Sequence, residues 1–264
     1  MEDVERDIKK TRFIFDRGDL GIYDNVYSKS NEDLRQLYSY IDFYGKNVLS
    51  VLGSGDQIFY AYMNGAKNVD AFDKNKLANY YYYLRLWFIK YFRQFRPDLS
   101  RNTIRLLLEK VDPVNDLENN AYYYWDSIIK EFDDYMIRAF FIESPNDDVI
   151  TDYELNVISD KILDKKLNFL NIDISQNNDI EEQYDVLIAS NIHDWVANDG
   201  GSLVYYTNNL YKLLNDYGLV LISCFSSTNT SFLRNSLFRD KFEFIKMART
   251  FDSDLYGYVY RKRR

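Results

Sequence analysis

Short apolar runs alternate along the chain with segments whose apolar residues recur every three or four positions. The first pattern is typical of buried strands and the second of helices with one buried face. The runs expected to form parallel strands are 47–52, 69–73, 167–173, 184–190 and 219–224, and an antiparallel pair is expected at 242–245 and 255–260. Helices are expected at 56–64, 76–95, 101–110, 121–141, 150–165 and 202–215. This alternation predicts an α/β sheet with helices on both faces.

The ends of these segments carry residue types that commonly start or stop helices. Ser30 is the expected N-cap of a helix that carries the apolar positions of 34–41, because an acid follows Ser30 by three residues. Gly65 and Gly218 are expected to stop the helices that precede them. Pro97 is expected to end the long helix before it.

Composition and charge narrow the class of protein. The 264 residues are 46% apolar, include one Cys and one His, and carry a formal net charge of −8. One Cys excludes an internal disulfide framework, and with one His no Cys/His metal site is expected. The acidic balance disfavours a nucleic-acid partner, because phosphate binding needs clustered Lys and Arg. Residues 1–12 are too charged for a signal peptide, and no window approaches the roughly 18 apolar residues of a membrane span, so we expect a cytoplasmic protein without a transmembrane segment.

A glycine turn, Gly53-Ser54-Gly55-Asp56, follows the first expected strand. Glycines at this position let the backbone approach a ligand and expose amides at a helix start. The turn departs from the dinucleotide fingerprint, because Ile58 stands where the third glycine would be, and it lacks the Lys of a P-loop. The residues are compatible with a ligand-binding loop or with a simple tight turn.

Polar residues also follow three other strands, at the edge where ligands of open α/β sheets bind. Asp73 can accept hydrogen bonds from both hydroxyls of a ribose, or cap the helix that starts near Lys74. The carboxylate or neighbouring backbone of Asp173 can meet an adenine amino group, or Asp173 can be a turn residue. Directly after the fourth strand, Ser190–Trp195 includes His193, a candidate general base or a satisfied polar group.

The order and spacing of these residues resemble those of class I S-adenosylmethionine-dependent transferases, over about 45–95 and 165–260. Val48–Asp56 looks like the family's glycine motif, Asp73 like its ribose-binding acid and Asp173-Ile174 like its adenine-binding step. Ser190–Trp195 looks like the segment that faces the sulfonium. The resemblance implies S-adenosylmethionine as cofactor, bound by Gly53, Ser54, Gly55, Asp56, Asp73, Lys74, Asp173, Ile174, Ser190 and Asn191.

The resemblance also implies the domain plan. Residues 47–264 are expected to form a Rossmann-like domain with a seven-stranded, mainly parallel sheet and a helical insertion after the second strand, at about 76–165. Residues 1–46 are expected to form an N-terminal helical lid segment. His193 and Asp194 are the candidate catalytic residues, and the candidate substrate-binding residues are Tyr23, Tyr27 and Trp195, because aromatic faces suit a sulfonium cation.

A closer resemblance concerns three short segments. Leu49–Asp56, Gly65-Ala66 and Phe72–Asn75 are similar to the family that contains the betaine-lipid synthases. This implies transfer of the 3-amino-3-carboxypropyl group of the same donor. We therefore predict an S-adenosylmethionine-dependent methyltransferase acting on a small-molecule or lipid-like acceptor, with aminocarboxypropyl transfer as the alternative. A nicotinamide-dependent oxidoreductase and a non-catalytic nucleoside-binding module remain open, whereas Asn191–Asp194 lacks the double proline of DNA amino-methyltransferases.

Overall fold

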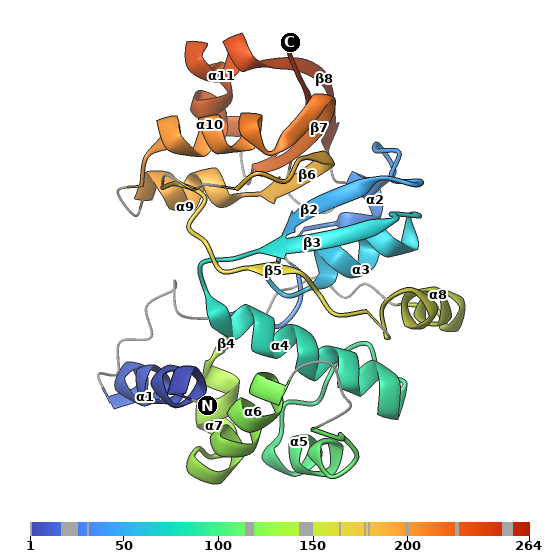
Figure 1. Ribbon diagram of the computed structural model, residues 1–264, viewed down its shortest axis with the longest axis vertical. Coiled ribbons are helices and arrows are strands. Elements are labelled where there is room, and N and C mark those ends of the chain that lie inside the picture. Colours follow the sequence, from blue (N-terminus) through green and yellow to red (C-terminus); the bar gives the residue numbers. More distant parts are fainter. Residues whose placement is uncertain are drawn as a thin grey trace. The chain divides into compact units, whose positions relative to one another are not determined.

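Seven strands form one sheet in the part of the chain that the structure, a computed structural model, describes (Figure 1). The described residues are 2–16, 26–30, 32–113, 119–142, 150–163, 165–176, 178, 180–198, 201–224, 227–249 and 256–264. The strand order is β5-β3-β2-β6-β7-β9-β8, in which the first five strands are parallel and β9 pairs antiparallel with β7 and with β8. The expected Rossmann-like, mainly parallel sheet with a closing antiparallel pair is confirmed.

The chain's internal contacts divide it into two units, of which the sheet unit comprises Glu32–Val51, Asp56–Lys74 and Leu167–Arg264. Its strands are β2 (Asn47–Val51), β3 (Asn68–Phe72), β5 (Phe169–Leu170), β6 (Tyr184–Ser190), β7 (Leu214–Cys224), β8 (Phe242–Arg249) and β9 (Tyr256–Lys262). Its helices are α2 (Leu34–Tyr38), α3 (Asp56–Met63), α9 (Ile192–Asn198), α10 (Leu203–Lys212), the 3-10 helix η3 (Ser227–Arg234) and α11 (Ser236–Lys241).

The helical unit comprises Met1–Asn31, Leu52–Gly55 and Asn75–Lys166. Its helices are α1 (Glu2–Asp16), α4 (Lys76–Trp87), the π-helix η2 (Phe88–Phe92), α5 (Arg101–Leu108), α6 (Asn119–Glu131), α7 (Asp134–Ala139) and α8 (Asp152–Ile162). Two short strands, β1 (Val26–Tyr27) and β4 (Phe141–Ile142), form a parallel pair. Among the described residues of the whole chain, no helix is long and apolar enough to cross a membrane.

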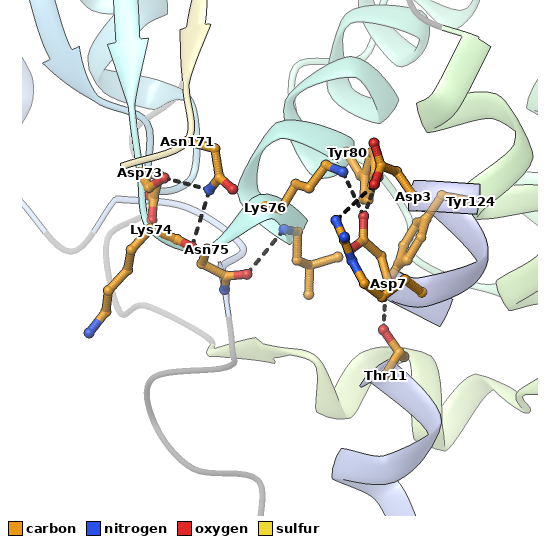
Figure 2. A network of polar contacts seen from close by, with 12 residues as sticks. Asp3, Asp7, Thr11, Asp73, Lys74, Asn75, Lys76, Tyr80, Tyr124 and Asn171 are labelled. Atoms are coloured by element: carbon orange, nitrogen blue, oxygen red, sulfur yellow. Dashed lines mark hydrogen bonds and ion pairs between the residues drawn. The ribbon is translucent and has the colours of Figure 1, made fainter. Parts of the chain in front are cut away.

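Polar contacts hold α1 against α4 and α6 within the helical unit (Figure 2). The Asp7 carboxylate oxygen Oδ2 accepts a hydrogen bond from the Tyr80 hydroxyl at 2.7 Å and lies 2.9 Å from Lys76 Nζ. The Thr11 and Tyr124 hydroxyl oxygens are 3.0 Å apart and buried. Burial strengthens such contacts, so these pairs fix α1 on the two tyrosine-bearing helices.

The sheet unit has helices on both faces, as expected. Successive residues of a strand point to opposite faces, and on one face the buried side chains of β6 and β7 pack against α10 and α11. This core includes Leu187, Ala189, Val220, Ile222, Tyr206, Leu210 and Phe238. On the other face, α2 lies so close to β9 that a Cβ on Gly257 would be 2.3 Å from Leu37 Cδ2. Only glycine fits at that position without a shift of the packed leucine.

Gly218 does not stop a helix, so that prediction was wrong. The helix α10 already ends at Lys212, and β7 begins at Leu214, which leaves Gly218 inside the strand. A Cβ on Gly218 would lie 3.0 Å from the Asn215 carbonyl oxygen and 3.2 Å from that of Tyr184. The glycine is required by this close approach of backbones, where the pairing of β6 with β7 shifts register.

Ser30 is not the N-cap of α2, which was also predicted wrongly. Asp33 is the N-cap, and its Oδ1 accepts a hydrogen bond from the Gln36 amide at 3.0 Å. Ser30 is buried three residues before that cap. The acid that was expected to close a capping box therefore caps the helix itself, and the apolar positions Leu34 and Leu37 are buried as expected.

Several other elements differ in length from the prediction: the expected helix 121–141 is divided between α6 and α7, and the strand expected at 219–224 already begins at Leu214. The expected helix 76–95 changes from α to π geometry at Phe88 and ends at Arg93, whose φ of 56° is left-handed. The expected strand 167–173 is only Phe169–Leu170, and this strand, β5, lies at an edge of the sheet and pairs with β3 alone. Short edge strands limit the exposed row of unpaired backbone groups.

Candidate functional site

The carboxyl ends of β2 and β3 lie level in the sheet unit. Val51, the last residue of β2, pairs with Phe72, the last residue of β3. Asp73 follows Phe72 directly and is half-buried. The alternative role of Asp73 as a helix cap is removed, because Asn75 caps α4 and its Oδ1 accepts a hydrogen bond from the Leu77 amide at 3.0 Å.

The turn that carries Asp73 is held by an amide from the segment after β5 (Figure 2). Asn171 Nδ2 donates to the carbonyl oxygen of Asp73 at 2.9 Å and to that of Lys74 at 3.2 Å. Both contacts use backbone atoms of the turn. The Asn171 amide therefore fixes the backbone of this turn, while the Lys74 side chain is exposed.

The Asp173 carboxylate stabilises its own turn. Oδ1 accepts hydrogen bonds from the Ser175 amide at 2.9 Å and from the Ser175 hydroxyl at 2.6 Å, and Gln176 Nε2 lies 3.4 Å from Oδ2. Next to it, Ile174 is buried, and its carbonyl oxygen accepts a hydrogen bond from Asn209 Nδ2 at 2.7 Å. The side chain of Asp173 thus has the turn role that the sequence left open, and the Asp173 carbonyl oxygen also accepts a hydrogen bond from Asn178 Nδ2 at 2.8 Å.

Ser190 ends β6 in a strained conformation. Its φ is 50°, in the left-handed region, which costs an L residue about 1 kcal/mol or more. Its hydroxyl donates to Glu32 Oε1 at 2.5 Å and lies 3.2 Å from Asn191 Oδ1. A strained conformation persists where surrounding contacts hold it, and the contact that holds Ser190 is the hydrogen bond to the buried Glu32 carboxylate.

Glu32 is a buried acid that sequence reasoning missed. Its side chain is 1% exposed, and burial raises the pKa of its carboxyl, against the hydrogen bonds from Ser190, Ser223 and Gln57, which lower that pKa. The residue stands in the polar run before α2, and that run has the composition of an ordinary helix start. No signal in the pattern of the sequence separates this buried acid from Asp33, the half-buried acid beside it.

His193 lies in the core of the sheet unit instead of at its surface. Its side chain is 2% exposed, its ring stacks on that of Phe232, and Nε2 lies 3.4 Å from Cys224 Sγ and 3.4 Å from Asp194 Oδ1. Burial lowers the pKa of His193, and the Asp194 carboxylate opposes that shift only in part. The imidazole is therefore neutral near pH 7, while the Asp194 side chain is 21% exposed.

The glycine turn belongs to the helical unit, where it contacts α4. Gly53 and Gly55 have φ values of 49° and 87°, and the Gly55 amide donates to the Leu52 carbonyl at 2.7 Å. The Ser54 carbonyl accepts a hydrogen bond from Arg85 Nη1 at 2.7 Å, and the side chain of Arg85 is fully buried. Sequence reasoning did not select Arg85, although it is the single charged residue between Leu77 and Ile89.

The remaining site predictions concern four residues. Asp56 begins α3 and is 1% exposed. Burial raises the pKa of Tyr38, and the charge of Asp56 contributes to the same shift. Tyr27 lies half-buried in β1, and Tyr23 lies outside the described residues. For Trp195 the structure describes the backbone, in α9. Among the described residues, no group of three or more His, Cys, Asp or Glu side chains could hold a metal ion.

Comparisons with known proteins return structures and no sequence relatives. No protein-family model and no curated protein matches the chain. Similar solved structures include a TehB-like S-adenosylmethionine-dependent methyltransferase from Corynebacterium glutamicum, with 13% identity, a TM-score of 0.46 and coverage of 99% of both chains. The rRNA methyltransferase AviRa from Streptomyces viridochromogenes has 8% identity and a TM-score of 0.49, over 91% of this chain and 87% of its own.

A third structure is the N-methyltransferase NodS from Bradyrhizobium japonicum in complex with S-adenosyl-L-homocysteine. It has 8% identity and a TM-score of 0.42, over 89% of this chain and 86% of its own. These likenesses concern a methyltransferase fold and assign no activity to this chain. They do correct one expectation. The acidic net charge was taken to exclude a nucleic-acid partner, but an rRNA methyltransferase is among the similar structures. That exclusion is withdrawn.

Proposed function

We propose that this chain is an S-adenosylmethionine-dependent methyltransferase that acts on a small-molecule or lipid-like acceptor. The observation that carries the proposal is the position of Asp73. It follows β3 at the edge of the sheet where the ends of β2 and β3 are level, and the cap of α4 is a different residue, Asn75. An acid at this place suits the two hydroxyls of a ribose, since a carboxylate offers two acceptor oxygens.

Other described residues fit the donor by their chemistry. The positive φ values of Gly53 and Gly55 open the turn after β2 to close approach by a ligand. The backbone amide N–H of Ile174 would meet the adenine, because the Asp173 carboxylate is engaged by Ser175 and the Ile174 carbonyl oxygen by Asn209. Ser190 and Asn191, at the end of β6, would contact the methionine part of the donor.

Under this proposal the protein aligns the acceptor with the donor and removes one proton from the acceptor. When bound, S-adenosylmethionine supplies an electrophilic methyl on a sulfonium, so no further activation of the donor is needed. The residues must hold the acceptor nucleophile in line with that methyl and exclude water. Asp194 is the better placed base, because its carboxylate is partly exposed, whereas His193 is buried and lies against it. His193 then acts by orienting Asp194.

Aminocarboxypropyl transfer is the alternative for the same donor site. The segments behind that resemblance have structural roles that either reaction needs. Gly65 has a φ of 92° at the end of α3, and Asn75 caps α4. Because these residues serve the fold, they do not discriminate between the two transferred groups, and the reaction product is the observation that does.

Calorimetric titration of the purified chain with S-adenosylmethionine, with NADH as the control titrant, tests the proposal. We expect saturable binding of the first ligand alone. Incubation of the bound protein with small-molecule, lipid and RNA fractions should then yield S-adenosylhomocysteine, whereas methylthioadenosine would mean aminocarboxypropyl transfer. Binding without either product would indicate the nucleoside-binding module, and no binding by a folded protein would contradict the proposal.

A further inference from the structure

Glu32 is an acid in the interior of the sheet unit, and the proposed chemistry does not use it. It precedes the N-cap of α2, and its carboxylate faces Ser190 at the end of β6, Ser223 near the end of β7 and Gln57 in the first turn of α3. Four segments that are distant in sequence therefore meet at one carboxylate. Burial of a carboxyl group costs free energy, and hydrogen bonds from its polar partners offset that cost.

We propose that Glu32 is a positioning residue that holds Ser190, and with it the segment Asn191–Asp194, in the geometry that binds the donor and presents the base. This inference rests on the proposed function for the role of that segment. Glu32 is not a catalytic residue, because its side chain is 1% exposed and its carboxylate is engaged by groups of the protein itself.

The conformation of Ser190 explains why this segment needs an anchor. At a φ of 50°, Ser190 turns the chain out of β6 directly before α9, and the pairing of β6 with β7 shifts register between Ile188 and Ser190. An L residue leaves the left-handed region readily when nothing holds it. The hydrogen bond from the Ser190 hydroxyl to Glu32 Oε1 joins this turn to the segment before α2.

A second observation points the same way. Asn191, the next residue, lies within reach of the Ser190 hydroxyl, and its carbonyl accepts a hydrogen bond from the Asp194 amide at 3.0 Å. Displacement of Ser190 would therefore be passed through Asn191 to Asp194, the group we assign as base. The adjacent acid Asp33 has no such connection, since its side chain caps α2.

The test compares Glu32→Ala, Glu32→Gln and the matched control Asp33→Ala. Glu32→Ala should weaken binding of S-adenosylmethionine at least tenfold and speed hydrogen exchange of the amides in 190–198. Glu32→Gln should restore most of both, because its amide oxygen still accepts from Ser190. Asp33→Ala should lose helix stability yet change the dissociation constant less than twofold.

Exchange in 190–198 separates this inference from the proposed function. If the wild type does not bind the donor but Glu32→Ala still speeds exchange there and Asp33→Ala does not, the proposed function fails and the positioning role stands. Unchanged exchange and binding in folded Glu32→Ala would overturn the inference. Should Glu32→Ala not fold, Ser190→Ala removes the other partner of the hydrogen bond, and the same faster exchange is expected, with wild-type exchange overturning the inference.

Discussion

The Arg85 guanidinium donates a hydrogen bond from Nη1 to the Ser54 carbonyl oxygen at 2.7 Å, and so joins the middle of α4 to the glycine turn. The same guanidinium donates to the Phe95 carbonyl at 3.2 Å, and its Cζ lies 4.7 Å from the centre of the Phe95 ring. A fully buried arginine can bind two carbonyls in fixed directions because its donors form a planar fork. We infer that the shape of the glycine turn depends on α4.

Replacement of this arginine should destabilise the protein strongly. Arg85→Met keeps the apolar stem but leaves two carbonyls without their donor, so the free energy of unfolding should fall by about 3 kcal/mol. Arg85→Lys should be intermediate, since one ammonium does not reproduce the fork. Urea unfolding measures both, with Arg105→Met on the exposed face of α5 as a control that should stay within about 0.5 kcal/mol of wild type. Equal stability of the Arg85→Met variant and the wild type would contradict the role of Arg85.

The buried His193 should make stability depend on pH. Burial lowers the pKa of His193 in the folded state, so the unfolded chain binds the extra proton more readily. The histidine's contribution is therefore lost as pH falls below the ordinary value of about 6.5, by at most about 1.4 kcal/mol per pH unit. Unfolding free energies at pH 7.5 and 5.5 should differ less in His193→Gln than in wild type. The raised pKa of Glu32 acts in both proteins, so the comparison isolates the histidine, and equal pH dependence would refute this account.

The close approach of α2 to β9 predicts a coupled pair of substitutions. Gly257→Ala places a Cβ against Leu37 Cδ2, and because Leu37 is fully buried the unfolding free energy should drop by about 1–3 kcal/mol. Leu37→Val removes the clashing end of the side chain. In a double-mutant cycle the alanine should therefore cost less in the Val background than in wild type. Additive costs would show that Leu37 and Gly257 do not press on one another.

Much of the fold could be predicted from the pattern of apolar residues. Strands such as β2 and β6 are short apolar runs, and a strand buried on both faces has that pattern in any parallel sheet. Gly218 was misassigned because a glycine after an amphipathic helix has the same local pattern whether it stops that helix or lies at a register shift. Only the pairing of β6 with β7, a long-range contact, decides between the two.

The candidate site was predictable where function follows strand order, and not where it depends on contacts distant in sequence. Asp73 directly follows a strand, and in an open parallel sheet ligands bind at the carboxyl ends of the strands. Glu32 and Arg85 act through partners far along the chain, such as Ser190 and Ser54. The burial of His193 also depends on such contacts, with Cys224 and Phe232, so the residues around it in the sequence do not indicate it.

Asp73 offers the most direct test of the proposed donor site, because its neighbour Asn75 provides a matched control. Asn75→Ala removes the cap of α4 and should cost about 1 kcal/mol of stability, with little effect on ligand affinity. Asp73→Ala removes the carboxylate and leaves that cap in place, and urea unfolding measures the stability of both variants.

The decisive measurement is calorimetric titration of wild type, Asp73→Ala and Asn75→Ala with S-adenosylmethionine. We predict saturable binding by wild type and by Asn75→Ala, and a dissociation constant raised about tenfold or more in Asp73→Ala, as expected for the loss of hydrogen bonds to a charged group. Equal affinity of wild type and Asp73→Ala, in proteins of equal stability, would contradict the assignment of Asp73 to the ribose and with it the central claim.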